Sequence, residues 1–171
     1  PYIGHANNTY ELMRKKAETC IEKFVKENGK QFSEVEYVEK YFEVAFRKDI
    51  LVNGRIDLIR RKNIEGKWEV IIVDYKTGER KPSELEQRLQ LEIYALGYKK
   101  LTGQDADVLE IVDIEGNEVV SSRAVLPENL EDTAERIRDA CDEILDNNNV
   151  KRVCEKNKCK NCNHRLMCYS L

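Results

Sequence analysis

An acidic and a basic side chain near the middle of the chain have the types and spacing expected at a site for a divalent cation. Asp74 follows the apolar run Val70–Val73, and Lys76 lies two residues further on. Successive side chains of a strand alternate between its faces, so Asp74 and Lys76 are expected to point the same way. A carboxylate at the end of a buried strand is costly unless it is paired or binds a metal ion.

Asp57 is the expected second carboxylate. Residues 63–66 have the composition of a turn, which would make the segments on either side of it antiparallel neighbours. Asp57 could then approach Asp74 across this hairpin. Two carboxylates held close together repel each other, and Mg²⁺ or Mn²⁺, which prefer oxygen ligands, would relieve the repulsion.

The chemistry open to such a site is attack of water on a phosphate ester. A bound cation polarises the phosphate and lowers the pKa of a coordinated water. Lys76 could orient that water or neutralise charge that develops on the phosphate. The alternative is that Asp57, Asp74 and Lys76 form a structural ion pair, because an acid and a lysine two residues apart on a strand are common.

Three helices and five strands are expected to position these residues. Ser83 with Glu86 forms a capping box before the second helix, and Asn8 with Glu11 is a candidate cap for the first. Apolar periodicity predicts helices over residues 8–28, 83–101 and 128–146, and strands over 38–46, 51–61, 68–76, 108–113 and 119–124. This order predicts an α/β domain built around a mixed sheet.

Length and charge restrict the class of protein. The 171 residues suffice for one compact domain, and no apolar run approaches the roughly 18 residues of a membrane helix. The net charge of −3 does not by itself indicate a nucleic-acid binder, but residues 55–81 carry eight basic and five acidic side chains. Such a surface could bind phosphate, or it could be an ordinary solvated face. Because the chain begins with Pro1 rather than Met, we expect a fragment of a longer protein.

Three segments in order closely resemble the RecB-like branch of the PD-(D/E)XK nucleases: Gly54–Ile59, Val73–Gly78 and Gln90–Tyr94. The resemblance implies a restriction-endonuclease-like mixed β-sheet flanked by helices, with residues 1–150 forming an N-terminally truncated nuclease core. It assigns metal binding to two carboxylates and the backbone carbonyl between acid and lysine, here Asp57, Asp74 and Tyr75. It assigns catalysis to the larger set Asp57, Asp74, Lys76, Gln90 and Tyr94.

The resemblance also implies an activity and partners. The expected function is metal-dependent hydrolysis of DNA, with Mg²⁺ or Mn²⁺ as cofactor and single-stranded DNA as substrate. The expected context is an intracellular exonuclease module that works with a helicase module or other subunits of a repair or CRISPR complex. Two alternatives stay open: a catalytically weak module that binds DNA or protein, and a small zinc-bound interaction domain in which the acids are structural.

A cysteine-rich tail over residues 151–171 carries the fourth motif. Cys159, Cys162 and Cys168 resemble the C-terminal iron–sulfur signature of this branch, in which three such cysteines join an upstream one around a [4Fe–4S] cluster. That upstream cysteine is missing before the first helix, so Cys154 or Cys20 would have to replace it. Cys154 would equally complete a four-cysteine Zn²⁺ site.

Three further residues have weaker assignments. His5 is the candidate for a metal-binding histidine that many family members carry on the first helix, although its surroundings match poorly. Glu39 resembles a family position on the first strand that could support the metal site, and a solvated strand residue is the alternative. Trp68, the single tryptophan, is expected to pack rather than to stack on a base.

Overall fold

The computed structural model describes residues 3–77, 83–146, 159–160 and 162, with side chains from Thr9 onward. The chain divides into two compact units, Pro1–Glu135 and Arg136–Leu171, and every strand lies in the first. In chain order the elements are α1 (Ile3–Asn28), the short 3-10 helix η1 (Gly29–Glu34), β1 (Val35–Arg47), β2 (Ile50–Ile64), β3 (Lys67–Lys76), α2 (Glu84–Thr102), β4 (Val108–Asp113), β5 (Glu118–Ala124) and α3 (Pro127–Leu145).

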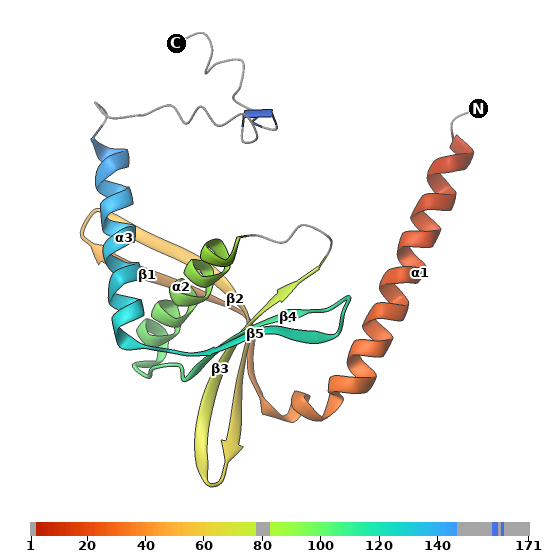
Figure 1. Ribbon diagram of the computed structural model, residues 1–171, viewed down its shortest axis with the longest axis horizontal. Coiled ribbons are helices and arrows are strands. Elements are labelled where there is room, and N and C mark those ends of the chain that lie inside the picture. Colours follow the sequence, from red (N-terminus) through yellow and green to blue (C-terminus); the bar gives the residue numbers. More distant parts are fainter. Residues whose placement is uncertain (1–2, 78–82, 147–158, 161, 163–171) are drawn as a thin grey trace. The chain divides into compact units, whose positions relative to one another are not determined.

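The five strands form one mixed sheet, as the sequence predicts, and their order in the sheet is β1-β2-β3-β4-β5 (Figure 1). Strands β1, β2 and β3 are joined by hairpins and run antiparallel, and β4 and β5 form a third antiparallel pair. Strand β4 lies parallel to β3, because α2 carries the chain back across the sheet between them. The ends of β3 and β4 therefore meet at the same edge of the sheet.

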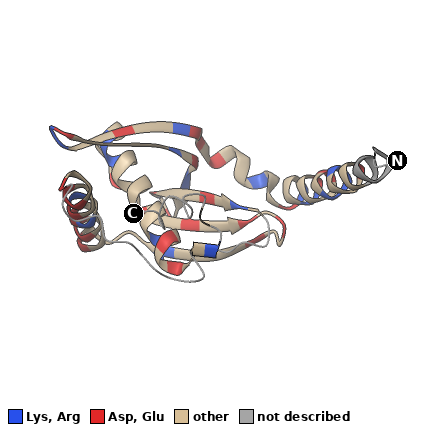
Figure 2. Cartoon of the chain, turned by 90° about the horizontal axis from the view of Figure 1, so that it is seen from above, with Lys and Arg blue, Asp and Glu red and all other residues tan. Residues whose placement is uncertain are grey.

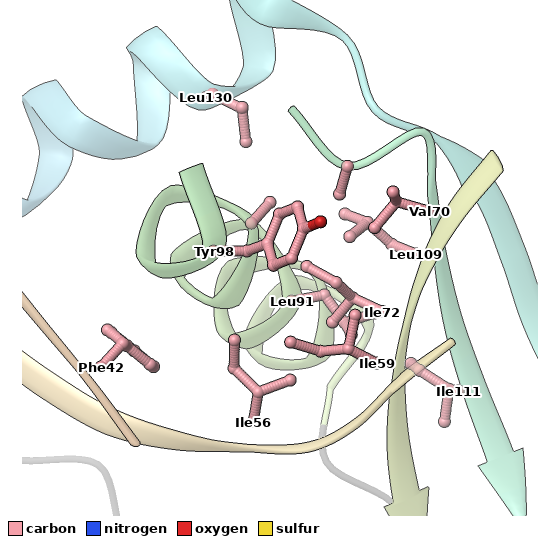
Figure 3. Close-up of a cluster of buried hydrophobic side chains, with 12 residues drawn as sticks. Phe42, Ile56, Ile59, Val70, Ile72, Leu91, Tyr98, Leu109, Ile111 and Leu130 are labelled. Carbon is pink, nitrogen blue, oxygen red and sulfur yellow. The ribbon is translucent and has the colours of Figure 1, made fainter. Parts of the chain in front are cut away.

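Helix α2 covers one face of the sheet and creates the main core (Figure 3). Tyr98 and Leu91 of α2 are 0% and 1% exposed and pack on strand residues that include Ile59 and Ile72. The start of α3 joins this core through Leu130. The sequence predicts the bounds of α2 well: Ser83 and Glu86 form the expected capping box, and Gly103 ends the helix with φ 74°.

The opposite face of the sheet carries a smaller apolar cluster, in which Leu58, Ile71 and Val73 are buried. The C-terminal part of α1 is attached on this side. The Phe24 ring lies 5.7 Å from the Tyr75 ring in an edge-to-face contact, and the Cys20 thiol donates to the Ile114 carbonyl at 3.2 Å. Cys20 is thus half-buried at an attachment point of α1 rather than in the core.

Two expectations about local structure are wrong. Helix α1 begins at Ile3 and runs through Asn8, so Asn8 does not cap it. Trp68 is 59% exposed and therefore does not serve as a packing residue. Its position near the tip of the β2–β3 hairpin explains the exposure, because α2 does not extend over that end of the sheet.

Helix α2 packs closely on the β1–β2 hairpin because two glycines leave room for the Phe42 ring between them. A Cβ atom on Gly97 of α2 would lie 2.5 Å from ring carbons of Phe42, and one on Gly54 of β2 would lie 2.9 Å from them. Phe42 is 1% exposed, so its ring has little room to move. The hairpin of β1 and β2 is therefore held against α2 by a contact that tolerates no added methyl group.

We expect Gly97→Ala to lower the free energy of unfolding by about 1–3 kcal/mol, because the new methyl group overpacks against Phe42. Urea unfolding measures the loss. Gly29→Ala is the matched control, since its Cβ would meet nothing within 4 Å. That change should raise stability by about 0.4–1 kcal/mol through the lower entropy of the unfolded chain. Equal effects of the two changes would contradict the packing described here.

Candidate active site

Asp74 and Lys76 form an ion pair at the C-terminal end of β3. Their side chains lie on the same face, as strand alternation predicts, with Lys76 Nζ 2.7 Å from Asp74 Oδ2. Asp74 is only 2% exposed, whereas the Lys76 side chain is 29% exposed. The pair thus joins a buried carboxylate to an ammonium group that reaches solvent.

Asp57 reaches the same edge of the sheet from β2. The pairing of β2 with β3 stops at Leu58 and Val73, so the two strands separate where the acids lie. Asp57 Oδ2 accepts a hydrogen bond of 2.9 Å from the backbone N–H of Tyr75. Asp57 is thus attached to the backbone of β3 one residue after Asp74.

Helix α2 adds Gln90 and Tyr94 to the site. Lys76 Nζ donates to Gln90 Oε1 at 2.8 Å, and Gln90 Nε2 donates to the Tyr94 hydroxyl at 2.9 Å. Gln90 and Tyr94 are four residues apart and share a helix face. A continuous chain of polar contacts therefore runs from the Asp74 carboxylate to the Tyr94 phenol.

A kink in β1 and β2 places Glu39 opposite Asp57. The register pairs Val38 with Leu58 and Lys40 with Ile56, which leaves Glu39 and Asp57 facing each other between these pairs. Glu39 has φ 51°, in the left-handed region that side chains other than glycine seldom adopt. Because the strand bends at this point, its carboxylate side chains do not point where the regular alternation of a strand would direct them.

Burial and like charges disturb the ionisation of the site. Burial raises the pKa of Asp74, Lys76 opposes that rise, and the Asp57 carboxylate adds to it. Burial also raises the pKa of Tyr94; its bond with Gln90 opposes the rise, and Asp57, Asp74 and Glu39 add to it. Glu39 and both aspartates therefore lie close enough to Tyr94 to raise the pKa of its phenol.

The donor set suits a hard divalent cation. The repulsion between the two carboxylates would be relieved by such an ion, and the backbone carbonyl of Tyr75 is the further oxygen ligand that the family resemblance predicts. Within the described part of the chain, no group of three or more His, Cys, Asp or Glu side chains stands ready to hold a metal ion. The side chain of His5 lies outside the described residues, so its predicted role stays a prediction.

The cysteine tail lies largely outside the described residues. Cys154 and Cys168 fall there, and their predicted roles stay predictions. Cys159 and Cys162 are described; Cys159 is half-buried and Cys162 is exposed. The Cys162 N–H donates to the Cys159 carbonyl at 3.3 Å, which places the two residues in one turn of the chain.

Sequence reasoning missed a buried ionic network behind Tyr75. Arg60 on β2 donates to Glu110 Oε2 at 2.5 Å and to Glu34 Oε2 at 3.2 Å, and Arg60 and Glu110 are 8% and 9% exposed. The pair lies on the sheet face that α1 covers, where the Tyr75 side chain also packs. Neither residue stands out in the sequence, because their pairing depends on strands separated by fifty positions.

Comparison with known proteins agrees with this geometry. The sequence model of the PD-(D/E)XK nuclease superfamily matches residues 4–169, and the chain belongs to that superfamily. Its fold is also that of a candidate exonuclease from Eubacterium rectale, with 15% identity, a TM-score of 0.54 and 90% of this chain covered. The chain spans 59% of that protein's length. No curated protein gives a significant match.

We expect Asp74→Asn to raise the free energy of unfolding of the metal-free protein at neutral pH. Burial raises the pKa of Asp74 above its ordinary 3.8, so the folded state binds the proton more tightly than the unfolded state does. The wild type then loses stability as pH rises from the ordinary value to the raised one, and the neutral variant does not. Urea unfolding in EDTA at several pH values measures this difference, which should vanish in strong acid.

Asp49→Asn is the control of opposite sign. The hydrogen bond from Arg47 lowers the pKa of Asp49, so its ionised form contributes stability above the ordinary aspartate range. Neutralising Asp49 should therefore lower stability slightly at neutral pH. An Asp74→Asn variant less stable than wild type at neutral pH would show that the Lys76 ion pair outweighs burial.

Proposed function

We propose that this chain is a divalent-metal-dependent deoxyribonuclease that hydrolyses phosphodiester bonds. The observation that carries the proposal is the convergence of Asp57, Asp74 and Lys76 at one edge of the sheet, with Gln90 and Tyr94 behind them. Membership of the nuclease superfamily supports it independently. Asp57, Asp74 and the Tyr75 carbonyl would hold Mg²⁺ or Mn²⁺, which activates water and polarises the phosphate.

The protein's own side chains have separate tasks in this proposal. Asp57 holds the end of β3 through the Tyr75 N–H, in the same residue whose carbonyl would bind the metal ion. Lys76 neutralises charge on the phosphate as the bond to the leaving oxygen breaks. Gln90 accepts from Lys76 and restricts its ammonium to that position, and Tyr94 orients the Gln90 amide.

The proposed substrate is single-stranded DNA and the proposed action is exonucleolytic, in a cytoplasmic assembly with a helicase module or other subunits of a repair or CRISPR complex. The resemblance to RecB-like nucleases supports this context, and the E. rectale protein is itself described as a candidate exonuclease. In the part of the chain that is described, none of the helices is both long and apolar enough to cross a bilayer.

Asp74→Ala and Lys76→Ala are each expected to slow cleavage of labelled single-stranded DNA in Mn²⁺ or Mg²⁺ by at least about 100-fold, the loss typical of removing one group that stabilises transition-state charge. The measurement is the single-turnover rate with enzyme in excess. EDTA should abolish cleavage by the wild type.

The ion pair of Lys99 and Asp105 provides matched controls. Its N–O distance is 2.8 Å, but both side chains are more than half exposed at the other end of α2. Lys99→Ala and Asp105→Ala should therefore cut at the wild-type rate. If wild type cuts no faster than Asp74→Ala, the nuclease proposal fails, and DNA affinity that persists without divalent metal would favour the binding-module alternative.

We also propose that the cysteine tail holds a [4Fe–4S] cluster, with Zn²⁺ as the alternative. The spacing of Cys159, Cys162 and Cys168 supports a metal site, and Cys154 or Cys20 is the candidate fourth ligand. The backbone hydrogen bond from Cys162 to Cys159 keeps these two cysteines close in the chain, which is compatible with shared ligation. In such a site the metal would be structural and would hold the tail together.

The cluster proposal predicts brown protein with bound iron and sulfide when the chain is purified without oxygen. Cys162→Ser should lose the iron and the visible absorption, because a thiolate ligand is removed. Cys141→Ser should keep both, since Cys141 is a free, half-buried thiol on α3 outside the cysteine run. Stoichiometric zinc without iron would support the alternative, and absence of both metals from the anaerobic protein would overturn the site.

A further inference from the structure

We propose that Tyr41 and Arg55, on the exposed face of the β1–β2 hairpin, form a binding platform for the nucleotide next to the scissile phosphate of a single-stranded nucleic acid. This inference rests on the proposed function and adds residues that the metal and catalytic set does not contain. Arg55 would bind a phosphate and the Tyr41 ring would stack on an unpaired base. The two residues are direct neighbours across the strand pair.

The face that carries them is open. Phe42 and Ile56 point into the core under α2 and are 1% and 0% exposed, so the residues next to them in each strand point the other way. Tyr41 is 53% exposed, and the Arg55 side chain is 64% exposed. Every residue of this face in the outer half of the hairpin is exposed, namely Tyr41, Glu43, Ala45, Leu51, Asn53 and Arg55.

The platform lies on the sheet face that points away from α2, and it reaches the candidate active site at Glu39 and Asp57, where β2 changes face. Arg55 lies two residues before Asp57 in β2, or about 7 Å along the strand, which is comparable to the step between neighbouring phosphates of an extended strand. Its guanidinium lies 3.5 Å from the Glu39 carboxylate, and Glu39 in turn acts electrostatically on Tyr94 together with Asp57 and Asp74. Strand β3 does not pair with this part of β2, so the hairpin extends past the site with one side uncovered.

The ion pair that now holds Arg55 is weak enough to be exchanged. Both partners are more than half exposed, and the 3.5 Å separation is long for a charge-assisted bond. A phosphate that displaced Glu39 would keep the guanidinium neutralised and would offer it two oxygens. Glu39 would then be free beside Asp57, at the kink that fixes its position.

The chemistry favours a single strand over other partners. Basic and acidic residues are interspersed along the strands and along α1 (Figure 2), and the chain has 32 acidic against 29 basic residues, so its charge does not favour binding of a duplex by electrostatics alone. An exposed tyrosine beside an arginine is the usual pairing for stacking on an unpaired base while neutralising its phosphate. The platform is therefore expected to contribute affinity for one nucleotide, close to the bond that is cut.

The test measures binding rather than cleavage, in a protein that carries Asp74→Asn so that the oligonucleotide stays intact. Fluorescence anisotropy with a short labelled thymidine oligonucleotide gives Kd. Tyr41→Ala and Arg55→Ala should each weaken binding by about five-fold or more, whereas Tyr41→Phe, which keeps the ring, should bind normally. Arg55→Ala should also reduce the slope of log K against log salt by about 0.7, the value for one phosphate of a single strand.

Two controls separate the platform from general effects. Lys67→Ala removes an exposed charge at the start of β3, seven residues or about 23 Å along the strand from Asp74, and should leave Kd unchanged. A second control uses a set of oligonucleotides that each lack the base at one position. At the position that stacks on Tyr41, loss of the base should weaken binding to the protein with Tyr41, and Tyr41→Ala should then weaken binding no further. Thermal melting checks that each variant is folded.

The proposal is overturned if Tyr41→Ala and Arg55→Ala bind like Lys67→Ala, or if no single-stranded oligonucleotide binds. Unchanged DNA affinity together with an altered oligomeric state would assign this face to protein contact and would equally overturn it. Failure of the nuclease proposal would look different. In that case the wild type would not cut in Mn²⁺, yet binding would still depend on Tyr41 and Arg55.

Discussion

The candidate site depends on one buried carboxylate, that of Asp74, whose negative charge is unfavourable away from water. Asp74 ends the most buried strand of the sheet and is 2% exposed, and burial dominates its ionisation even with Lys76 at 2.7 Å. A group in that position requires compensation from its surroundings, which here comes from Lys76, held in turn by Gln90 of α2. The crossover of α2 between parallel β3 and β4 is therefore both the main source of the core and the reason a helix residue reaches the acids.

Tyr75 connects the two sides of the sheet at this point. Its backbone N–H is bound by Asp57, while its ring packs against Phe24 of α1 near the buried pair of Arg60 and Glu110. Because Tyr75 is held at its backbone N–H and at its ring, its position is fixed by a strand and a helix rather than by a loop. The ionic network therefore lies beside Tyr75 on the α1 side of β3, whereas Lys76 contacts Gln90 on the α2 side.

Regular strand geometry does not account for how Asp57 and Glu39 are directed. Ile56 and Ile59 both enter the α2 core, although residues three apart in a regular strand point to opposite faces, so β2 changes face close to Asp57. Opposite it, Glu39 adopts φ 51°, a conformation that costs roughly 1–3 kcal/mol for such a residue. Strain of this kind persists where surrounding contacts enforce it, and Phe42, enclosed by Gly54 and Gly97, holds the hairpin immediately beyond the kink.

The sequence by itself determined the elements, their order and the identity of the acids and lysine, because capping residues, apolar periodicity and the Asp-x-Lys spacing are local features. It also placed Asp74 and Lys76 on one face and Gln90 and Tyr94 on another, since each pair belongs to a single strand or helix. Only the tertiary structure decided that Lys76 meets Gln90, that Asp57 binds the Tyr75 N–H, and that Arg60 is buried against Glu110. It also exposed Trp68, which composition alone would bury. These outcomes depend on strand register, on the kink at Glu39 and on the reach of α2, and each of those is set by contacts between residues distant in the chain.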